Sequence, residues 1–272
     1  MATADPKLST GGAGGTDSTD STDRKFTADS LAPLRAELAP ARRLYVGYSG
    51  GLDSHVLLHA LVALLGPAGV TALHINHQLS PQAATWAGHC RQTCADLGVA
   101  YIEETVEIGA RADGLEAAAR TARYAAFDRY VGVDDLLLLA HHADDQAETL
   151  LFRLLRGAGP RGLAGIPRAR ALSYGRLLRP LLDVRRTSLY QYARCEGLRW
   201  IEDDSNQVLD MDRNYLRHRV LPAVAARAWL AAPLCAARPT ASAATSATPT
   251  CARSTSAASV WAGAWTRCGS RP

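Results

Sequence analysis

Residues 45–54 read Tyr45-Val46-Gly47-Tyr48-Ser49-Gly50-Gly51-Leu52-Asp53-Ser54 and lead directly into the apolar segment 55–65. The first residues are typical of a β-strand, and the apolar segment is typical of a helix. Gly50 and Gly51 between them can take positive φ and let a ligand approach the backbone. The helix start adds unpaired N–H groups and the positive end of the helix dipole. The stretch therefore predicts a phosphate-binding nest.

Three polar side chains complete this expected nest. Ser49 and Ser54 add hydroxyl donors, and Asp53 adds a carboxylate where a Mg²⁺ ion carried by a polyphosphate can sit. The chain has no G-x-x-x-x-G-K-[ST] sequence, so the stretch is not a Walker P-loop, and the junction is not a G-x-G-x-x-G fingerprint either. The alternative is that Ser49 and Asp53 only cap a helix. Capping alone requires neither the double glycine nor both serines.

Strand and helix patterns alternate along the chain after a short helix expected over 30–40. We expect strands over 44–48, 70–76, 101–106 and 135–140, and helices over 53–65, 82–97, 115–131 and 144–155. This alternation predicts an α/β fold, a Rossmann-like parallel sheet with helices on both faces. The carboxyl ends of such strands face one crevice, where the Ser49 loop, His74–His77 and His141–Asp145 all fall.

The second chemical motif is Ala140-His141-His142-Ala143-Asp144-Asp145-Gln146-Ala147-Glu148-Thr149. Asp145 and Glu148 are three residues apart and share a helix face. Two carboxylates beside a phosphate nest can hold Mg²⁺ or an ammonium group. The alternative is that they complement the helix dipole and that both histidines lie on the surface. No third ligand has a spacing that suits zinc.

Beyond residue 156 the pattern loosens. Residues 156–165 are rich in glycine and arginine and predict a loop, followed by a helix over 184–195 and a short basic helix over 214–220. Residues 1–219 carry a net charge of −1, so a nucleic-acid site there must be a local patch. Its candidate members are Arg179, Arg185, Arg186, Arg194, Arg199, Arg213, Arg217 and Arg219. Solvated helix faces explain these arginines equally well.

Taken together, these motifs resemble a known family. Ser-Gly-Gly-Leu-Asp-Ser at 49–54 is similar to the PP-loop of the ATP-pyrophosphatase superfamily. The whole set resembles the tRNA(Ile)-lysidine synthetase family over about 41–222, and the block 141–165 is its most specific part. Further matching stretches are His-Ile-Asn-His-Gln-Leu-Ser at 74–80, Glu-Ala-Ala-Ala-Arg-Thr-Ala-Arg-Tyr at 116–124, Arg-Pro-Leu-Leu at 179–182, Glu-Asp-Asp-Ser-Asn at 202–206 and Arg-Asn-Tyr-Leu-Arg at 213–217.

The resemblance implies a two-step reaction on tRNA(Ile) with a CAU anticodon. ATP adenylates the wobble cytidine, and the ε-amine of L-lysine then displaces AMP to form lysidine. The candidate catalytic residues are Asp53, Asp145, Glu148 and Arg217, and the candidate Mg²⁺ ligands are Asp53 and Asp145. Ser49, Gly50, Gly51, Leu52, Asp53 and Ser54 are the candidate ATP-binding residues. Arg120 is a candidate phosphate or RNA contact, and His141 either transfers a proton or caps a helix.

On this basis we expect a disordered tail over 1–29, a PP-loop ATP-pyrophosphatase catalytic domain over 30–222 and a disordered low-complexity tail over 223–272. The last segment holds three of the five tryptophans and three of the six cysteines, but no acidic residue. That composition suggests a GC-rich gene read out of frame, and the alternative is a native Ala/Ser/Thr/Pro tail. Without a secretory signal or an apolar run of membrane-spanning length, we expect a cytoplasmic protein with reduced cysteines.

Two other functions remain open on sequence alone. The first is tRNA 2-thiocytidine synthesis on the same scaffold, which calls for a C-x-x-C pair, whereas Cys90 and Cys94 are four residues apart. The second is an inactive fragment that binds ATP only.

Overall fold

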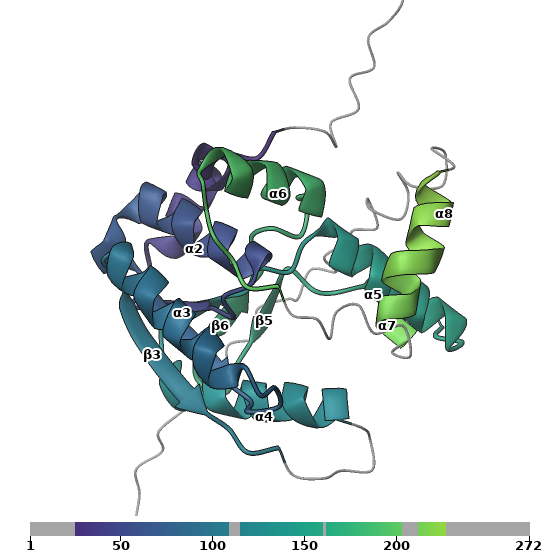
Figure 1. Ribbon diagram of the computed structural model, residues 1–272, viewed down its shortest axis with the longest axis horizontal. Coiled ribbons are helices and arrows are strands. Elements are labelled where there is room, and N and C mark those ends of the chain that lie inside the picture. Colours follow the sequence, from purple (N-terminus) through teal and green to yellow (C-terminus); the bar gives the residue numbers. More distant parts are fainter. Residues whose placement is uncertain (1–24, 109–114, 160–161, 203–211, 227–272) are drawn as a thin grey trace, which may run out of the picture. The chain divides into compact units, whose positions relative to one another are not determined.

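The computed structural model describes residues 25–108, 115–159, 162–202 and 212–226 (Figure 1). Of the tails expected over 1–29 and 223–272, residues 1–24 and 227–272 lie outside the described residues. The folded body begins before the expected boundary at residue 30, because Phe26 is buried and its ring packs edge-on against Tyr192, with centroids 5.3 Å apart. It also continues past residue 222, through the helix α8, Leu221–Ala225.

In the described residues the chain builds a six-stranded sheet in the order β3-β2-β1-β4-β6-β5. All neighbouring strands are parallel except β5 and β6, which are antiparallel. The strands are β1 Leu44–Gly47, β2 Thr71–Asn76, β3 Ala100–Thr105, β4 Leu136–Leu138, β5 Ala169–Ala171 and β6 Arg176–Leu178. The Rossmann-like α/β fold is confirmed. The expectation of a purely parallel sheet is wrong at one edge, where an unpredicted hairpin adds β5.

Helices cover both faces of this sheet (Figure 1). One face packs against α2, Leu52–Leu65, together with α3, Ala83–Asp96, and α6, Arg186–Cys195. The other face packs against α4, Leu115–Tyr130. The helix α5, Ala143–Leu155, lies beside the C-terminal elements (Figure 1). The remaining elements are η1 Ala28–Leu34, α1 Arg35–Leu38, η2 Pro67–Gly69, η3 Gly162–Ala164, α7 Asp212–Tyr215 and the π-helical turn η5 Leu216–Val220.

The strands of the sheet centre are apolar on both sides because both sides are covered. Along β1, Val46 enters the core under α2, whereas Tyr45 enters the core under α4. Along β4, Leu138 and Leu137 divide between the two cores in the same way. Successive residues of a strand point to opposite faces, so a buried parallel strand is an unbroken apolar run. This explains why the run Leu136–Leu139 contains only leucine.

The strand order places a topological switch point at the centre of the sheet. From β1 the chain moves outward to β2 and β3, then returns to β4 on the opposite side of β1. The loops that leave β1 and β4 therefore diverge, and ligands of such sheets bind at this switch point. These two loops carry the Ser49–Ser54 stretch and the His141–Glu148 motif. Among the described residues, we find no helix with the length and apolar character needed to span a bilayer.

Candidate functional site

The loop after β1 uses its two glycines differently. Gly50 has a φ of +82°, which glycine adopts without strain, and its carbonyl accepts a hydrogen bond from the Ile201 N–H at 2.9 Å. Gly51 has a φ of −75° and is the N-cap of α2. Of the two glycines that can take positive φ, only Gly50 does so. Its role is at the helix start, where it leaves the backbone uncovered.

The two serines hold the loop in shape. The Ser49 N–H donates to Ser54 Oγ at 3.2 Å, and Ser54 Oγ donates to the Gly51 carbonyl at 3.0 Å. No side chain caps α2. Within the described chain, the N–H groups of residues 52–54 have no acceptor. Three free N–H groups at a helix start form an anion-binding site, so the geometry favours the nest over the capping alternative.

Substitution of Gly50 tests whether the nest depends on this backbone conformation. A Cβ at Gly50 would lie 2.7 Å from Cys90 Sγ at a positive φ, whereas a Cβ at Gly51 would meet nothing closer than Ser49 Oγ at 3.5 Å. We expect Gly50→Ala to lower the free energy of unfolding by about 2 kcal/mol and Gly51→Ala to change it by about 0.5 kcal/mol or less. Urea denaturation of the two variants measures both values. Equal losses in the two variants would contradict this account of the loop.

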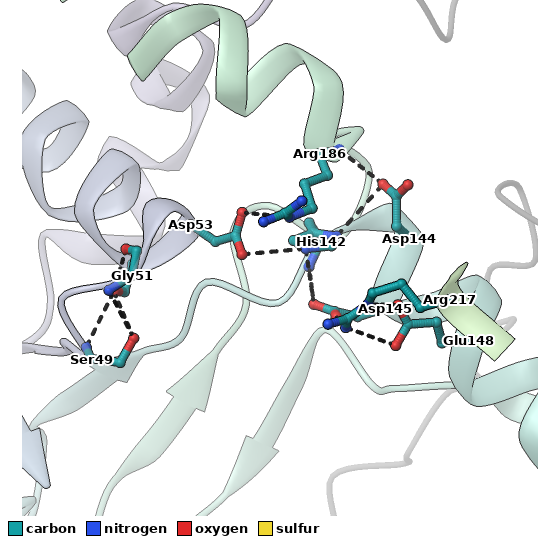
Figure 2. Close-up of polar contacts among 10 residues, drawn as sticks. Ser49, Gly51, Asp53, His142, Asp144, Asp145, Glu148, Arg186 and Arg217 are labelled. Atoms are coloured by element: carbon teal, nitrogen blue, oxygen red, sulfur yellow. Dashed lines mark hydrogen bonds and ion pairs between the residues drawn. The ribbon is translucent and has the colours of Figure 1, made fainter. Parts of the chain in front are cut away.

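A buried histidine lies at the centre of the site. His142 is the N-cap of α5 and is 2 % exposed. Its Nε2 lies 3.6 Å from a carboxylate oxygen of Asp53 and 3.6 Å from one of Asp145, and its Nδ1 lies 3.6 Å from Asp144 (Figure 2). The His142 backbone N–H also donates to the Asp145 carboxylate at 3.0 Å. The alternative reading, in which both histidines lie on the surface, is therefore wrong for His142.

Arg186 joins a third helix to this cluster. It is the first residue of α6, and its backbone N–H donates to the Asp144 carboxylate at 2.8 Å. Its guanidinium Nε lies 3.7 Å from the second carboxylate oxygen of Asp53. The N-termini of α2, α5 and α6 thus meet at one point (Figure 2). Their dipoles add positive potential, which favours an anionic ligand.

Sequence reasoning missed the roles of His142 and Arg186 in this cluster. His142 follows a fully apolar strand, at the carboxyl end where sites of parallel sheets form, and this was the available signal. Arg186 lies near the start of the helix predicted over 184–195, but its pairing with Asp53 joins residues more than 130 positions apart and leaves no local trace in the sequence.

Attraction between opposite charges favours the charged forms of Asp53 and His142. Burial alone would lower the pKa of His142, but Asp53, Asp145 and Asp144 outweigh it and raise the pKa above 6.5. Burial alone would raise the pKa of Asp53, but His142, Arg186 and Arg217 outweigh it and lower the pKa. At neutral pH, Asp53 is therefore ionised and His142 is stabilised as an imidazolium.

The raised pKa of His142 predicts a stability change with pH. The folded chain holds this proton more tightly than the unfolded chain, in which the pKa is close to 6.5. The stabilisation is therefore complete below pH 6.5 and is lost as the pH rises through the higher folded-state value. We expect the stability difference between wild type and His142→Gln to shrink between pH 6 and pH 9.

Urea unfolding of both proteins across this pH range measures the difference and cancels the titration of other histidines. Those with lowered pKa values, such as His55 and His77 at about 4, act in the opposite direction, because they destabilise the fold as the pH falls below 6.5. A difference that stays constant or grows with pH would refute the assignment to His142.

Glu148 and Arg217 form a second part of the site. Arg217 Nε donates to one oxygen of Glu148 at 2.5 Å, and its Nη2 donates to the other at 2.9 Å. The same Nη2 lies 3.6 Å from Asp145 (Figure 2). Burial raises the pKa of Glu148, and Arg217 offsets only part of this effect. Arg217 projects from the π-helical turn η5, a rare conformation that occurs often at functional sites.

The structure thus brings all four candidate catalytic residues together, namely Asp53, Asp145, Glu148 and Arg217. Their roles stay predictions.

The members of the expected arginine patch, in contrast, do not all lie on the surface. Arg179 is 1 % exposed, so its expected place on an RNA-facing surface is wrong. Arg120 is exposed, and its guanidinium lies 5.1 Å from the centre of the Tyr124 ring. The guanidinium of Arg170 lies 4.4 Å from the centre of the same ring.

The two candidate Mg²⁺ ligands fit a metal that is only partly held by protein. Asp53 and Asp145 approach the same nitrogen of His142, and Asp53 Oδ1 is buried without a hydrogen-bond donor in the described residues. No group of three or more His, Cys, Asp or Glu side chains in that part of the chain forms a metal cage. Mg²⁺ commonly takes one or two carboxylates and completes its shell with water and phosphate oxygens. Both carboxylates therefore suit a metal that arrives with a polyphosphate.

Comparison with known proteins places this geometry in a family. A family model described as a PP-loop domain matches residues 22–224. The tRNA(Ile)-lysidine synthase of Pseudomonas syringae is 54% identical over 202 residues, which cover 71% of this chain and 45% of the relative. The enzyme of the same name from Alkalilimnicola ehrlichii is 50% identical over 206 residues, covering 75% of this chain and 46% of the relative. The chain thus spans about half the length of the curated relatives it matches.

A solved structure shares the fold at low sequence identity. It is the U34-tRNA thiolase NcsA from Methanococcus maripaludis, with a TM-score of 0.59 and 12% identity, covering 76% of this chain and 75% of that one. The switch-point crevice, the glycine nest after β1 and the matching family model agree with one another. The chain belongs to the PP-loop domain family.

Proposed function

We propose that this chain is the catalytic PP-loop part of a cytoplasmic tRNA(Ile)-lysidine synthetase. In this reaction ATP adenylates the wobble cytidine of a CAU anticodon, and the ε-amine of L-lysine displaces AMP. One observation carries the proposal: relatives of that name are 50–54% identical over 202 and 206 residues, and the PP-loop family model matches residues 22–224, which hold the whole site. The site geometry supports it through an anion nest and a carboxylate cluster that face the same crevice.

The free N–H groups at the start of α2 are suited to the phosphates of ATP. Charge develops on the pyrophosphate as it leaves, and fixed N–H dipoles stabilise that charge without reorganising. A Mg²⁺ ion held by Asp53 and Asp145 supplies further electrostatic stabilisation of the phosphate oxygens when it is bound. Arg186 contacts the oxygen of Asp53 that His142 does not contact, and its guanidinium adds a donor that suits phosphate.

Asp145 and Glu148 are the proposed partners of the lysine ammonium group. Arg217 donates two hydrogen bonds to Glu148 but lies 3.6 Å from Asp145. The charge of Asp145 is therefore less fully compensated by Arg217 than that of Glu148. Asp145 is also more exposed than Glu148, with 21% against 6% of the side chain accessible. In this arrangement Glu148 fixes Arg217, and Arg217 orients Asp145 toward the incoming ammonium.

Sulfur transfer is the weaker alternative for this chain. Cys90 and Cys94 are fully buried in the core under α3, and burial raises the pKa of both thiols to about 12. A thiol with so high a pKa carries almost no thiolate, which is the reactive form. These cysteines therefore support packing rather than sulfur chemistry.

The deciding experiment is lysine-dependent AMP release by the purified chain. We expect AMP and pyrophosphate to form when ATP, Mg²⁺, L-lysine and a tRNA(Ile) transcript with the CAU anticodon are present. The matched control is the same transcript with the wobble cytidine changed to uridine, which offers no substrate. Equal AMP release from both transcripts, or release that does not depend on lysine, would exclude the proposed reaction.

A further inference from the structure

Arg179 is a buried cation directly behind the site. It follows β6, and its guanidinium makes three hydrogen bonds with no acidic partner among them. Its Nη1 donates to the Pro167 carbonyl at 2.7 Å, its Nη2 donates to the Tyr124 hydroxyl at 3.2 Å, and its Nε donates to Nδ1 of His141 at 3.2 Å. Burying an arginine is costly, so a position that is 1 % exposed indicates a specific use of its donors.

The contact with His141 determines where the imidazole carries its proton. An arginine guanidinium can only donate, so His141 Nδ1 must be the acceptor of the pair. A neutral imidazole has one acceptor nitrogen and one N–H donor. The proton of a neutral His141 therefore lies on Nε2.

The surroundings of His141 keep the ring neutral. Burial is the largest cause of the lowered pKa of His141, and neighbouring positive charges lower it further. The facing groups are Arg179 after β6, Arg120 and Arg123 of α4, and His142 at the start of α5. Together they lower the pKa of His141 to about 3. A histidine with this pKa is neither an imidazolium nor an effective base at neutral pH.

The free side of His141 is available to a ligand. His141 follows β4 at the switch point and precedes His142, the centre of the carboxylate cluster. In the described part of the chain, Nε2 has no hydrogen-bond partner, and it is not one of the fully buried unpartnered atoms. The atom is therefore in contact with solvent.

We propose that Arg179 is a positioning residue that holds His141 as the neutral tautomer with its proton on Nε2, so that the site presents a fixed donor to a substrate oxygen. This replaces the expected proton transfer by His141, since an Nε2 that already carries a hydrogen cannot accept one. The substrate part of the inference rests on the proposed function, where the candidate oxygens belong to a phosphate or to the cytidine ring carbonyl. The assignment of the His141 tautomer does not depend on the proposed function.

Nitrogen NMR of the ¹⁵N-labelled full chain at pH 7 tests the inference without any substrate. The His141 signals are assigned by their loss in His141→Gln. We expect Nε2 to be protonated, Nδ1 to be unprotonated, and a coupling between Arg179 Nε and His141 Nδ1 across the hydrogen bond. A protonated Nδ1, or an imidazolium at this pH, would overturn the proposal in the unmodified protein, whatever the variants do.

Two variants separate positioning from simple packing. Arg179→Lys keeps a cation but removes the fixed fork, so His141 should exchange between tautomers and its pKa should rise. Tyr124→Phe removes a different contact of Arg179 and should leave the His141 tautomer unchanged. An unchanged tautomer in a folded Arg179→Lys variant would overturn the proposal. A correct tautomer in a chain without lysine-dependent AMP release would refute the proposed function and leave the role of Arg179 standing.

Discussion

Asp53→Asn should reduce pyrophosphate release about 100-fold or more and leave the free energy of unfolding almost unchanged. The carboxylate is about 29% exposed, and its ionic contacts are long, at 3.6 Å to His142 and 3.7 Å to Arg186. Contacts of this kind contribute about 1 kcal/mol or less to stability. Its value to the reaction is greater, because it is a candidate ligand of the Mg²⁺ ion that meets the phosphate charge. Pyrophosphate assays and urea denaturation measure the two effects separately.

Asp144→Asn is the matched control for this experiment. Asp144 also lies 3.6 Å from His142 and accepts the backbone N–H of Arg186, but its side chain is more exposed, at 45%. Asparagine can still accept that N–H, so the start of α6 is kept. We expect Asp144→Asn to lose less than tenfold in activity, which is about the effect of weakening one charge-assisted contact in a polar environment. Equal losses in both variants would assign the effect of Asp53 to the charge of His142 rather than to the metal.

Arg217→Met should cause the largest loss of stability at the site. It leaves the carboxylate of Glu148 buried without its two donors. Breaking a fully buried pair costs about 3–5 kcal/mol, and since the Arg217 side chain is 34% exposed we expect about 2–3 kcal/mol. Arg217→Met combined with Glu148→Gln should recover most of that loss, because no buried charge remains. Activity should not recover, because Asp145 also loses its partner.

The pH dependence of Arg217→Met provides an independent check. Burial raises the pKa of Glu148, and without Arg217 it should rise further. The folded variant then binds a proton more tightly than the unfolded chain, so its stability falls as the pH rises. We expect the deficit relative to wild type to be smaller at pH 5 than at pH 8 in urea titrations. A deficit that grows toward acidic pH would show that Glu148 is not the residue left uncompensated.

The centre of the fold was predictable because its signals are local. Apolar runs and the turn residues between them predicted the strands β1 to β4 and the helices that cover them, to within a few residues. The hairpin of β5 and β6 was not predictable from periodicity. Each of its strands has three residues, and arginines at 170 and 176 interrupt the apolar pattern. Three residues are too few for an alternation to be recognised.

The sequence identified four members of the candidate site, but not the roles of His142 and Arg186 and not the pairings. The motifs identified Asp53, Asp145, Glu148 and Arg217, since each lies at a strand end or on a motif helix. The contact of Glu148 with Arg217 spans 69 residues, and no local pattern encodes it. Arg179 is the clearest failure, because arginine is almost always exposed and its burial depends on acceptors from three distant segments.

The two outer strands of the sheet also affect how molecules of this protein meet one another. An outer strand offers unpaired backbone groups to which a second chain can add. In β3, Glu103 pairs with Arg91 at 2.8 Å, and Glu104 pairs with Arg129, so the strand carries fixed charges along its length. At the other edge, β5 has only three residues. Charge on one border and shortness on the other both discourage the addition of a strand from a second chain.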